Sequence, residues 1–403
     1  MSLIINTTEV SPEMQILRLA AQLELEDTSL SRIKELMSSS IEWTQVMSYS
    51  KRWGIQTFLF EHIQNNHLKP YVPDDHYQTL QNAYQRQGMQ TLYLRRQIQE
   101  LKETFTQEKI DFCLIKGAEL IETIYTHSPV RPMSDIDILC HRDDIRSIQK
   151  ALSGLGYTQK TMHQSQTLES LATIRKHFPP FFHKKRHTIE IHFNLFSGLS
   201  IHENQTKGVW ETAVSVQKYT QFHLSKEQHL LFMCSHLAYH ILSPHEGLVL
   251  YWFCDISQWI KKYHDQMDWS FFTQLHPQEL KKRALFMLKL IQNEWDVPVP
   301  SILFQDDDTK TEDTLVTILK KSIAEDGSGS QRKSVFSYYR EIWFDKAPGW
   351  SFKTRLIYWF HLLFPQTAYL KNRYQIKKKI LVPMYLVFHP FFLIFRALKR
   401  LIR

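Results

Sequence analysis

Two aspartates spaced two residues apart, Asp135 and Asp137, open the segment with the clearest chemical potential. They begin an apolar run that extends to Cys140 and predicts a short buried β-strand. Alternate residues of a strand project from the same face, so both carboxylates are expected on one side. Carboxylate oxygens are preferred ligands of Mg²⁺. The pair is therefore a candidate metal site, and the alternative is a solvated strand end.

A third carboxylate, Glu190, lies in the segment 187–193, where apolar and polar residues alternate as in a half-buried strand. If Glu190 meets the aspartate pair, the three carboxylates can hold two metal ions about 3.5–4 Å apart, an arrangement that suits in-line phosphoryl displacement. Glu190 could also act as a general base, or simply belong to the polar face of its strand. His192 is expected to hydrogen-bond near Glu190 or to line the same cleft.

Lys116 and Gly117 follow a short apolar run at 112–115 and are the candidate phosphate-binding turn. Glycine permits a tight turn before a helix, whose N-terminal amides can face a triphosphate. Lys116 and Arg131 can neutralise phosphate charge beside it. The alternatives are that Lys116 is an ordinary lysine at a strand end and that Arg131 only pairs with an aspartate.

These motifs, K-G, then R-x-x-x-D-I-D, then E-I-H, resemble the nucleotidyltransferase superfamily of the DNA polymerase beta-like fold. Within it, they are most similar to a poorly characterised bacterial family that also has a helix ending in G-Y, here Gly156-Tyr157. The motifs cover 112–196, and a weaker likeness runs from about 20 to 300. The resemblance implies Mg²⁺-dependent transfer of a nucleoside monophosphate from an NTP such as ATP to an acceptor, which could be a small molecule, a glycan, a protein or RNA.

The resemblance also implies roles for individual residues. Those expected to be catalytic and to bind the metal are Asp135, Asp137 and Glu190. Those expected to bind the nucleotide are Lys116, Gly117, Ala118, Arg131 and Ser134. The weaker helical likeness adds His236 and Asp255, which either line the cleft with His192 or join two helices.

Ala118 is a departure from the superfamily pattern, in which a serine often follows the glycine and binds the terminal phosphate. This departure motivates a second hypothesis, a catalytically silent nucleotidyltransferase-fold protein that serves as a binding or accessory component of a biosynthetic cluster. A third hypothesis is a toxin-like or antitoxin-like enzyme that modifies protein or tRNA.

Hydrophobic periodicity predicts an α+β protein in which helices flank a small α/β core. Helical runs are expected at 43–63, 226–242, 248–263 and 278–295. A cap at Ser11 followed by Pro12 predicts the start of the first helix. The expected divisions are an N-terminal helical region at 1–108, the nucleotidyltransferase core at 109–200, a helical domain at 201–323, a Gly/Ser-rich linker at 324–333 and a basic, aromatic helical tail at 334–403.

Charge and composition narrow the classes of partner and compartment. The net charge is +8, but residues 371–403 hold nine Lys or Arg and no Asp or Glu, so the rest of the chain is nearly neutral. A broad surface for duplex DNA is therefore not expected. The four cysteines form no C-x-x-C pair, the N-terminus has no signal-peptide pattern, and no window of about 20 uncharged apolar residues occurs. These features predict a cytoplasmic protein with reduced thiols.

The segment 380–395 is free of charge and lies between Lys377-Lys378-Lys379 and a second basic group that begins at Arg396. It is shorter than a spanning helix and contains two prolines. Basic residues beside apolar and aromatic ones suit an anionic membrane surface, which suggests peripheral contact of 371–403 with the inner face of the membrane. The alternative is a pair of helices that packs on the body of the protein.

Overall fold

A computed structural model describes residues 11–159, 177–196, 208–216, 218–242, 249–275, 278–304 and 379–401, together with isolated positions between 318 and 376. It is an α+β protein with a six-stranded mixed sheet and helices on either side of it in the sequence, which confirms the predicted fold class. The predicted linker at 324–333 lies outside the described residues.

Four short helices form the N-terminal region: α1 (Pro12–Ala20), α2 (Asp27–Ser38), α3 (Trp43–Arg52) and α4 (Gln56–Asn65). The Ser11 hydroxyl accepts a hydrogen bond from the Met14 N–H at 3.3 Å, so the predicted cap is confirmed. The prediction of a single helical run at 43–63 was wrong, because α3 ends at Arg52 and the chain turns at Gly54 before α4 begins at Gln56. This glycine has φ +70°, and a Cβ there would lie 2.8 Å from the Tyr251 ring.

The sheet has the strand order β3-β4-β2-β1-β6-β5. Its strands are β1 (Phe112–Leu114), β2 (Asp135–Cys140), β3 (Phe181–His183), β4 (Arg186–His192), β5 (Val214–Ser215) and β6 (Gln221–His223). The pairs β2/β4 and β1/β6 are parallel, and the other neighbours are antiparallel. The sheet thus continues past residue 200, where the predicted core ended, because β5 and β6 extend its β1 edge.

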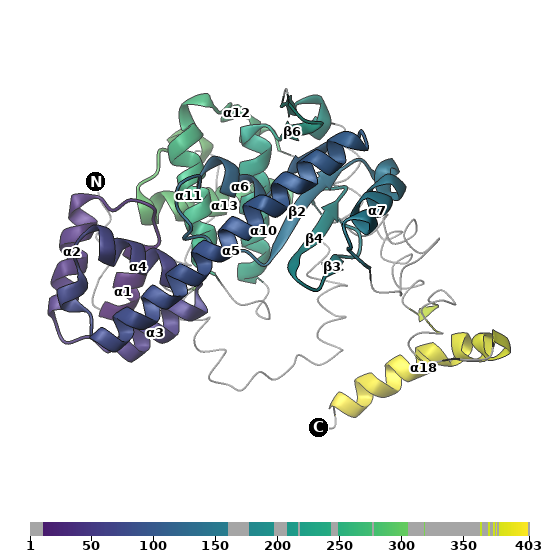
Figure 1. Ribbon diagram of the computed structural model, residues 1–403, viewed down its shortest axis with the longest axis horizontal. Coiled ribbons are helices and arrows are strands. Elements are labelled where there is room, and N and C mark those ends of the chain that lie inside the picture. The colour runs from purple at the N-terminus through teal and green to yellow at the C-terminus, as the bar shows by residue number, and fades with distance from the viewer. Residues whose placement is uncertain are drawn as a thin grey trace.

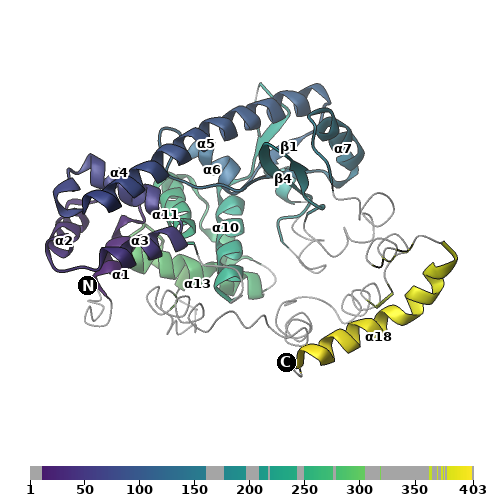
Figure 2. The same ribbon diagram turned by 60° about the horizontal axis from the view of Figure 1, so that its bottom comes forward.

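Three helices connect with the sheet: α5 (Asp74–Gln107), α6 (Gly117–Thr123) and α7 (Ile145–Gly154). The long α5 runs from the N-terminal helices to the sheet in both views (Figures 1 and 2) and contacts β4 and α7. The short α6 follows β1 and contacts β2. The two strands that carry the candidate carboxylates therefore lie at the centre of the sheet with helices packed beside them.

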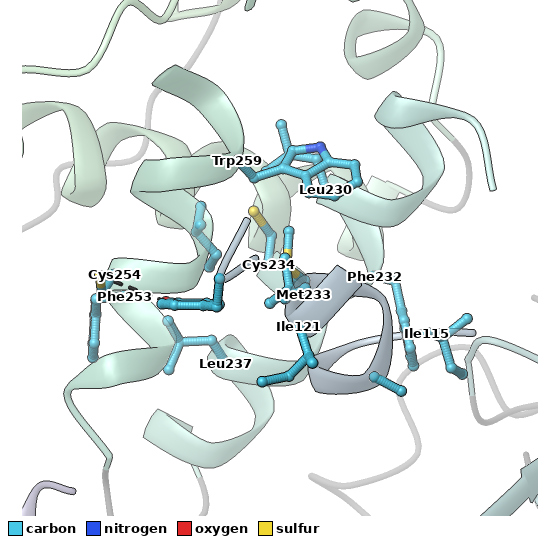
Figure 3. Packing of buried hydrophobic residues seen from close by; sticks show 14 of the residues in the cluster. Ile115, Ile121, Leu230, Phe232, Met233, Cys234, Leu237, Phe253, Cys254 and Trp259 are labelled. Carbon is cyan, nitrogen blue, oxygen red and sulfur yellow. Dashed lines mark hydrogen bonds between the residues drawn. The ribbon is translucent and has the colours of Figure 1, made fainter. Parts of the chain in front are cut away.

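The C-terminal helical block consists of α10 (Lys226–Leu242), α11 (Tyr251–Tyr263), α12 (Ser270–Thr273) and α13 (Gln278–Trp295). Its α10 contacts α11, α12 and α13. Figure 3 shows that apolar side chains of α10 and α11, such as Met233, gather around Ile121 of α6, while Phe232 lies toward Ile115. The helical block and the turn after β1 therefore share one hydrophobic core.

Helix α18 (Val382–Leu401) follows a 3₁₀ turn at Lys379–Leu381 and lies apart from the sheet and the helical block in both overall views (Figures 1 and 2). None of the described helices has both the length and the apolar character needed to cross a membrane.

Candidate functional site

The parallel pairing of β2 and β4 brings the two predicted acidic segments together. Asp137 is the register partner of Glu190, and Asp135 is the partner of Thr188. Because alternate residues share a face, the four side chains belong to one side of the sheet, together with His192 two residues beyond Glu190. The sequence predicted that the carboxylates would meet, and the strand register places Asp137 beside Glu190.

Asp137 is the centre of the cluster. Its Oδ1 lies 2.8 Å from Nζ of Lys116 and 2.7 Å from Nε2 of His192. Nε2 of His192 also lies 3.8 Å from Oε2 of Glu190. The side chains of Asp137 and His192 are almost completely buried, whereas that of Glu190 is 23% exposed. Glu190 is thus the carboxylate of this pair that solvent reaches most easily.

One oxygen or nitrogen atom each of Asp137, Glu190 and His192 lies within 4.8 Å of the others, close enough to share a metal ion. Two carboxylates and an imidazole form a donor set that binds divalent cations. Asp135, which the sequence placed in this set, is not one of the three, although its side chain lies on the same face. His192, expected to be an accessory residue, takes that place in the geometry.

The pKa values of Asp135 and Asp137 are shifted in opposite directions. Burial by itself would raise the pKa of Asp137, but the Lys116 ammonium and the His192 ring hold that pKa well below its usual range. Burial and the negative charge of Asp137 raise the pKa of Asp135. Asp137 therefore remains ionised, and Asp135 is the carboxyl group that takes up a proton more readily. A cation near both would favour the ionised form of Asp135.

The turn after β1 holds Lys116 in an unusual conformation. Lys116 has φ +50°, a region that side chains rarely adopt and that costs about 1–3 kcal/mol. Two contacts hold it there: the Ile115 N–H donates to the Asp137 carbonyl at 3.2 Å, and the Lys116 N–H donates to Nε2 of His229 at 3.1 Å. His229 comes from α10, so the helical block fixes the turn that points Lys116 at Asp137.

His229 has no recognisable signal in the sequence, because it is a histidine among the apolar residues of a helix. It is buried, and its ring packs edge-on against Trp259 at 4.3 Å between centroids. Burial lowers the pKa of His229 to about 3. The ring is therefore neutral, and Nε2 is available to accept the Lys116 N–H.

This pKa predicts a loss of stability in mild acid. Above pH 6.5 the ring is neutral in both states, but below it the unfolded chain binds a proton that the folded protein excludes. His229 should therefore cost about 2 kcal/mol of unfolding free energy between pH 7 and pH 5. Denaturant unfolding at both values should show a smaller loss in His229→Gln, whose amide oxygen still accepts the N–H. The control is His127→Gln at an exposed histidine. This variant should lose as much unfolding free energy between pH 7 and pH 5 as the unmodified protein does.

Arg131 lies in a buried ion pair. Its Nε and Nη2 donate to the two carboxylate oxygens of Asp255 in α11, at distances between 2.7 and 3.1 Å. The hydroxyl of Tyr125 donates to the same carboxylate at 2.7 Å. Asp255 thus joins α11 to the loop before β2. The structure favours a positioning role for Arg131, because its guanidinium is occupied by Asp255.

Gly117 is needed for this pair to fit. A Cβ at this position would lie 2.9 Å from Cζ of Arg131 and closer still to Nη1. The guanidinium cannot retreat without losing its bonds to Asp255. The glycine that the sequence assigned to a phosphate turn therefore also makes room for Arg131.

We expect Gly117→Ala to lower the free energy of unfolding by about 1–3 kcal/mol, the usual cost of overpacking. Gly88→Ala in α5 is the matched control, because a Cβ there would meet nothing within 4 Å. Because alanine favours the interior of a helix more than glycine does, Gly88→Ala should raise the free energy of unfolding by about 0.5–1 kcal/mol. Equal effects of the two substitutions in chemical denaturation would show that Arg131 does not restrict Gly117.

The remaining predicted residues lie around this cluster or beyond it. Ala118 is fully buried in the first turn of α6. The hydroxyl of Ser134 donates to Asp135 at 3.1 Å and is exposed. His236 contacts His240 and Trp252, with ring centroids at 4.4 and 5.2 Å. The described contacts of His236 therefore connect α10 with α11.

Comparison with protein families gives one finding that agrees with this geometry. A family model described as "Uncharacterised nucleotidyltransferase" matches residues 39–295, more than half of the chain. The match includes α3 to α13 and hence the whole candidate site. No curated protein and no solved structure gives a significant match.

Proposed function

Since the chain belongs to the family of uncharacterised nucleotidyltransferases, we propose that it is a Mg²⁺-dependent enzyme that transfers a nucleoside monophosphate from an NTP to an acceptor hydroxyl or phosphate. The observation that carries this proposal is the pairing of Asp137 with Glu190 beside Lys116 on one face of the sheet. Such a site acts mainly by positioning and by electrostatic stabilisation of the transferring phosphoryl group.

Asp137, Glu190 and His192 would hold the metal, with Asp135 next to them. Bound there, Mg²⁺ would neutralise charge on the phosphate oxygens. In the transfer, an acceptor oxygen forms a bond to the α-phosphorus, the bond from that phosphorus to the bridging oxygen breaks, and pyrophosphate leaves. The greater exposure of Glu190 supports its role as the base that takes the acceptor's proton.

Lys116 supplies a positive charge for the phosphates. Its side chain is 16% exposed. Burial lowers the pKa of Lys116, but the charge of Asp137 and the hydrogen bond to it, together with the charges of Asp135 and Glu190, raise that pKa above its ordinary value. The strained turn and His229 aim the Lys116 ammonium at the carboxylates. Gly117, Ala118 and Ser134 surround the same turn and strand start, where we place the nucleotide. The free, buried cysteines support a reducing compartment, and we place the reaction in the cytoplasm.

The alternative function is a catalytically silent binding or accessory protein. Two observations favour it: Ala118 stands where a serine is common in the superfamily, and the Lys116 ammonium already pairs with Oδ1 of Asp137, a candidate metal ligand. In this alternative the Lys116 ammonium would take the place of the metal ion beside Asp137.

Incubation of the purified 403-residue chain with Mg²⁺, each α-labelled NTP and a cell lysate distinguishes the enzyme from the silent protein. Transfer of label to a small molecule, glycan, protein or RNA, abolished by a chelator, supports the enzyme and identifies the acceptor. A rise in melting temperature with NTP and Mg²⁺ but without label transfer supports the silent protein. If there is no label transfer and no rise in melting temperature, the result would argue against a nucleotide site.

A further inference from the structure

The surface of α18 carries a continuous exposed apolar stripe, formed by Met384, Val387, Phe388 and Phe391. Their spacing of three and four residues places them along one side of the helix. Each is between 47% and 63% exposed, in contrast to the buried aromatic residues of the body. Ile380 and Leu381 of the preceding turn are also exposed and extend the stripe toward its N-terminal end. An exposed surface of this size and character is typical of an interaction site.

A different side of α18 is already covered by the chain that precedes it. The hydroxyl of Tyr374 lies 2.7 Å from Nδ1 of His389, which is 1% exposed. The Tyr374 ring also packs on the rings of Tyr385 and Phe392, with centroids 5.0 and 5.5 Å away. Val382, Tyr385, His389 and Phe392 share a helix side that differs from that of the stripe. The preceding segment therefore buries one side of the helix and leaves the apolar stripe outside.

The charge around α18 indicates what covers the stripe. Residues 371–403 contain nine Lys or Arg and no acidic residue. Lys377-Lys378-Lys379 precede the helix, and Arg396, Lys399 and Arg400 belong to its last turns. Two copies joined through this stripe would bring like charges together, which is unfavourable. An anionic bilayer surface accepts apolar side chains and attracts basic ones at the same time.

We propose that α18 lies in the interface of an anionic lipid bilayer, with the apolar stripe inserted between the headgroups and the basic residues at its two ends against lipid phosphates. The helix lies along the surface and does not span it, in agreement with the absence of a spanning segment among the described helices. Such an anchor would place the candidate site near the membrane. The inference does not depend on nucleotide transfer, because it concerns a helix that lies apart from the sheet (Figure 2).

Flotation of the 403-residue chain with phosphatidylcholine vesicles, with and without phosphatidylglycerol, tests this proposal. The protein should float with the anionic vesicles, and binding should weaken as salt is raised, because the charge attraction is screened. The double variant Val387→Asp/Phe391→Asp should lose at least about tenfold in vesicle affinity. Leu92→Asp in α5, where the leucine is 69% exposed, is the matched control and should bind as the unmodified protein does.

Three results would overturn the proposal. The first is no flotation with anionic vesicles. The second is equal flotation of the unmodified protein and the double variant. The third is a concentration-dependent dimer in size-exclusion chromatography that the double variant abolishes while neither protein binds vesicles, since the stripe would then join two copies. Circular dichroism of both variants establishes that they are folded.

Discussion

Asp137→Asn is expected to reduce nucleotidyl transfer at least about a hundredfold, the scale on which removal of one preorganised electrostatic group acts. Asp137 is the register partner of Glu190 and the common partner of Lys116 and His192. The amide keeps the shape and one oxygen, but it removes the negative charge that a divalent cation needs. The loss should appear in the initial rate of transfer from the labelled NTP at saturating Mg²⁺.

The matched control for this experiment is Asp143→Asn. It makes the same chemical change at an exposed residue just after β2 and should leave the rate within about twofold. Thermal unfolding of each variant separates a loss of chemistry from a loss of folded protein. A rate for Asp137→Asn equal to that of the control would refute the proposed site.

Two further variants identify the metal-binding set. If Asp137, Glu190 and His192 hold the ion, His192→Gln should raise the Mg²⁺ concentration required for half-maximal rate more than Asp135→Asn does. The opposite order would support the metal-binding set that the sequence predicted, which consists of Asp135, Asp137 and Glu190.

Asp255→Ala is expected to lower the free energy of unfolding by about 3–5 kcal/mol, because it leaves the charge of Arg131 buried without its partner. The guanidinium cannot escape this cost by losing its proton, because arginine stays protonated in proteins. Tyr125 loses its acceptor in the same variant. Denaturant unfolding at neutral pH measures the loss.

The control is Asp265→Ala, which removes an ion pair with His264 from a side chain that is 87% exposed. Surface pairs contribute about 0–1 kcal/mol, so this change should be nearly neutral. The double variant Arg131→Met/Asp255→Leu should recover much of the stability, because apolar residues of similar volume replace a buried pair well. A loss below about 1 kcal/mol in Asp255→Ala would contradict the role of this pair as the joint between α11 and the sheet.

The sequence by itself determined the family, the fold class and most of the elements. Helices at 226–242 and 278–295 begin and end where hydrophobic periodicity predicted them. The K-G, D-I-D and E-I-H motifs predicted that Asp137 and Glu190 would lie near each other. These features are local, since a period of 3.6 or 2 and a short motif are complete within one segment of the chain.

Only the tertiary structure decided which residues become partners across long separations. Arg131 could have contacted phosphate or one of the aspartates of β2, but the packing of α11 supplies Asp255 instead. His229 supports Lys116 from a helix more than 100 residues away. The register of β2 on β4 brings His192 to Asp137. Such contacts depend on how separate hydrophobic faces bury one another, and no single segment of sequence contains that information.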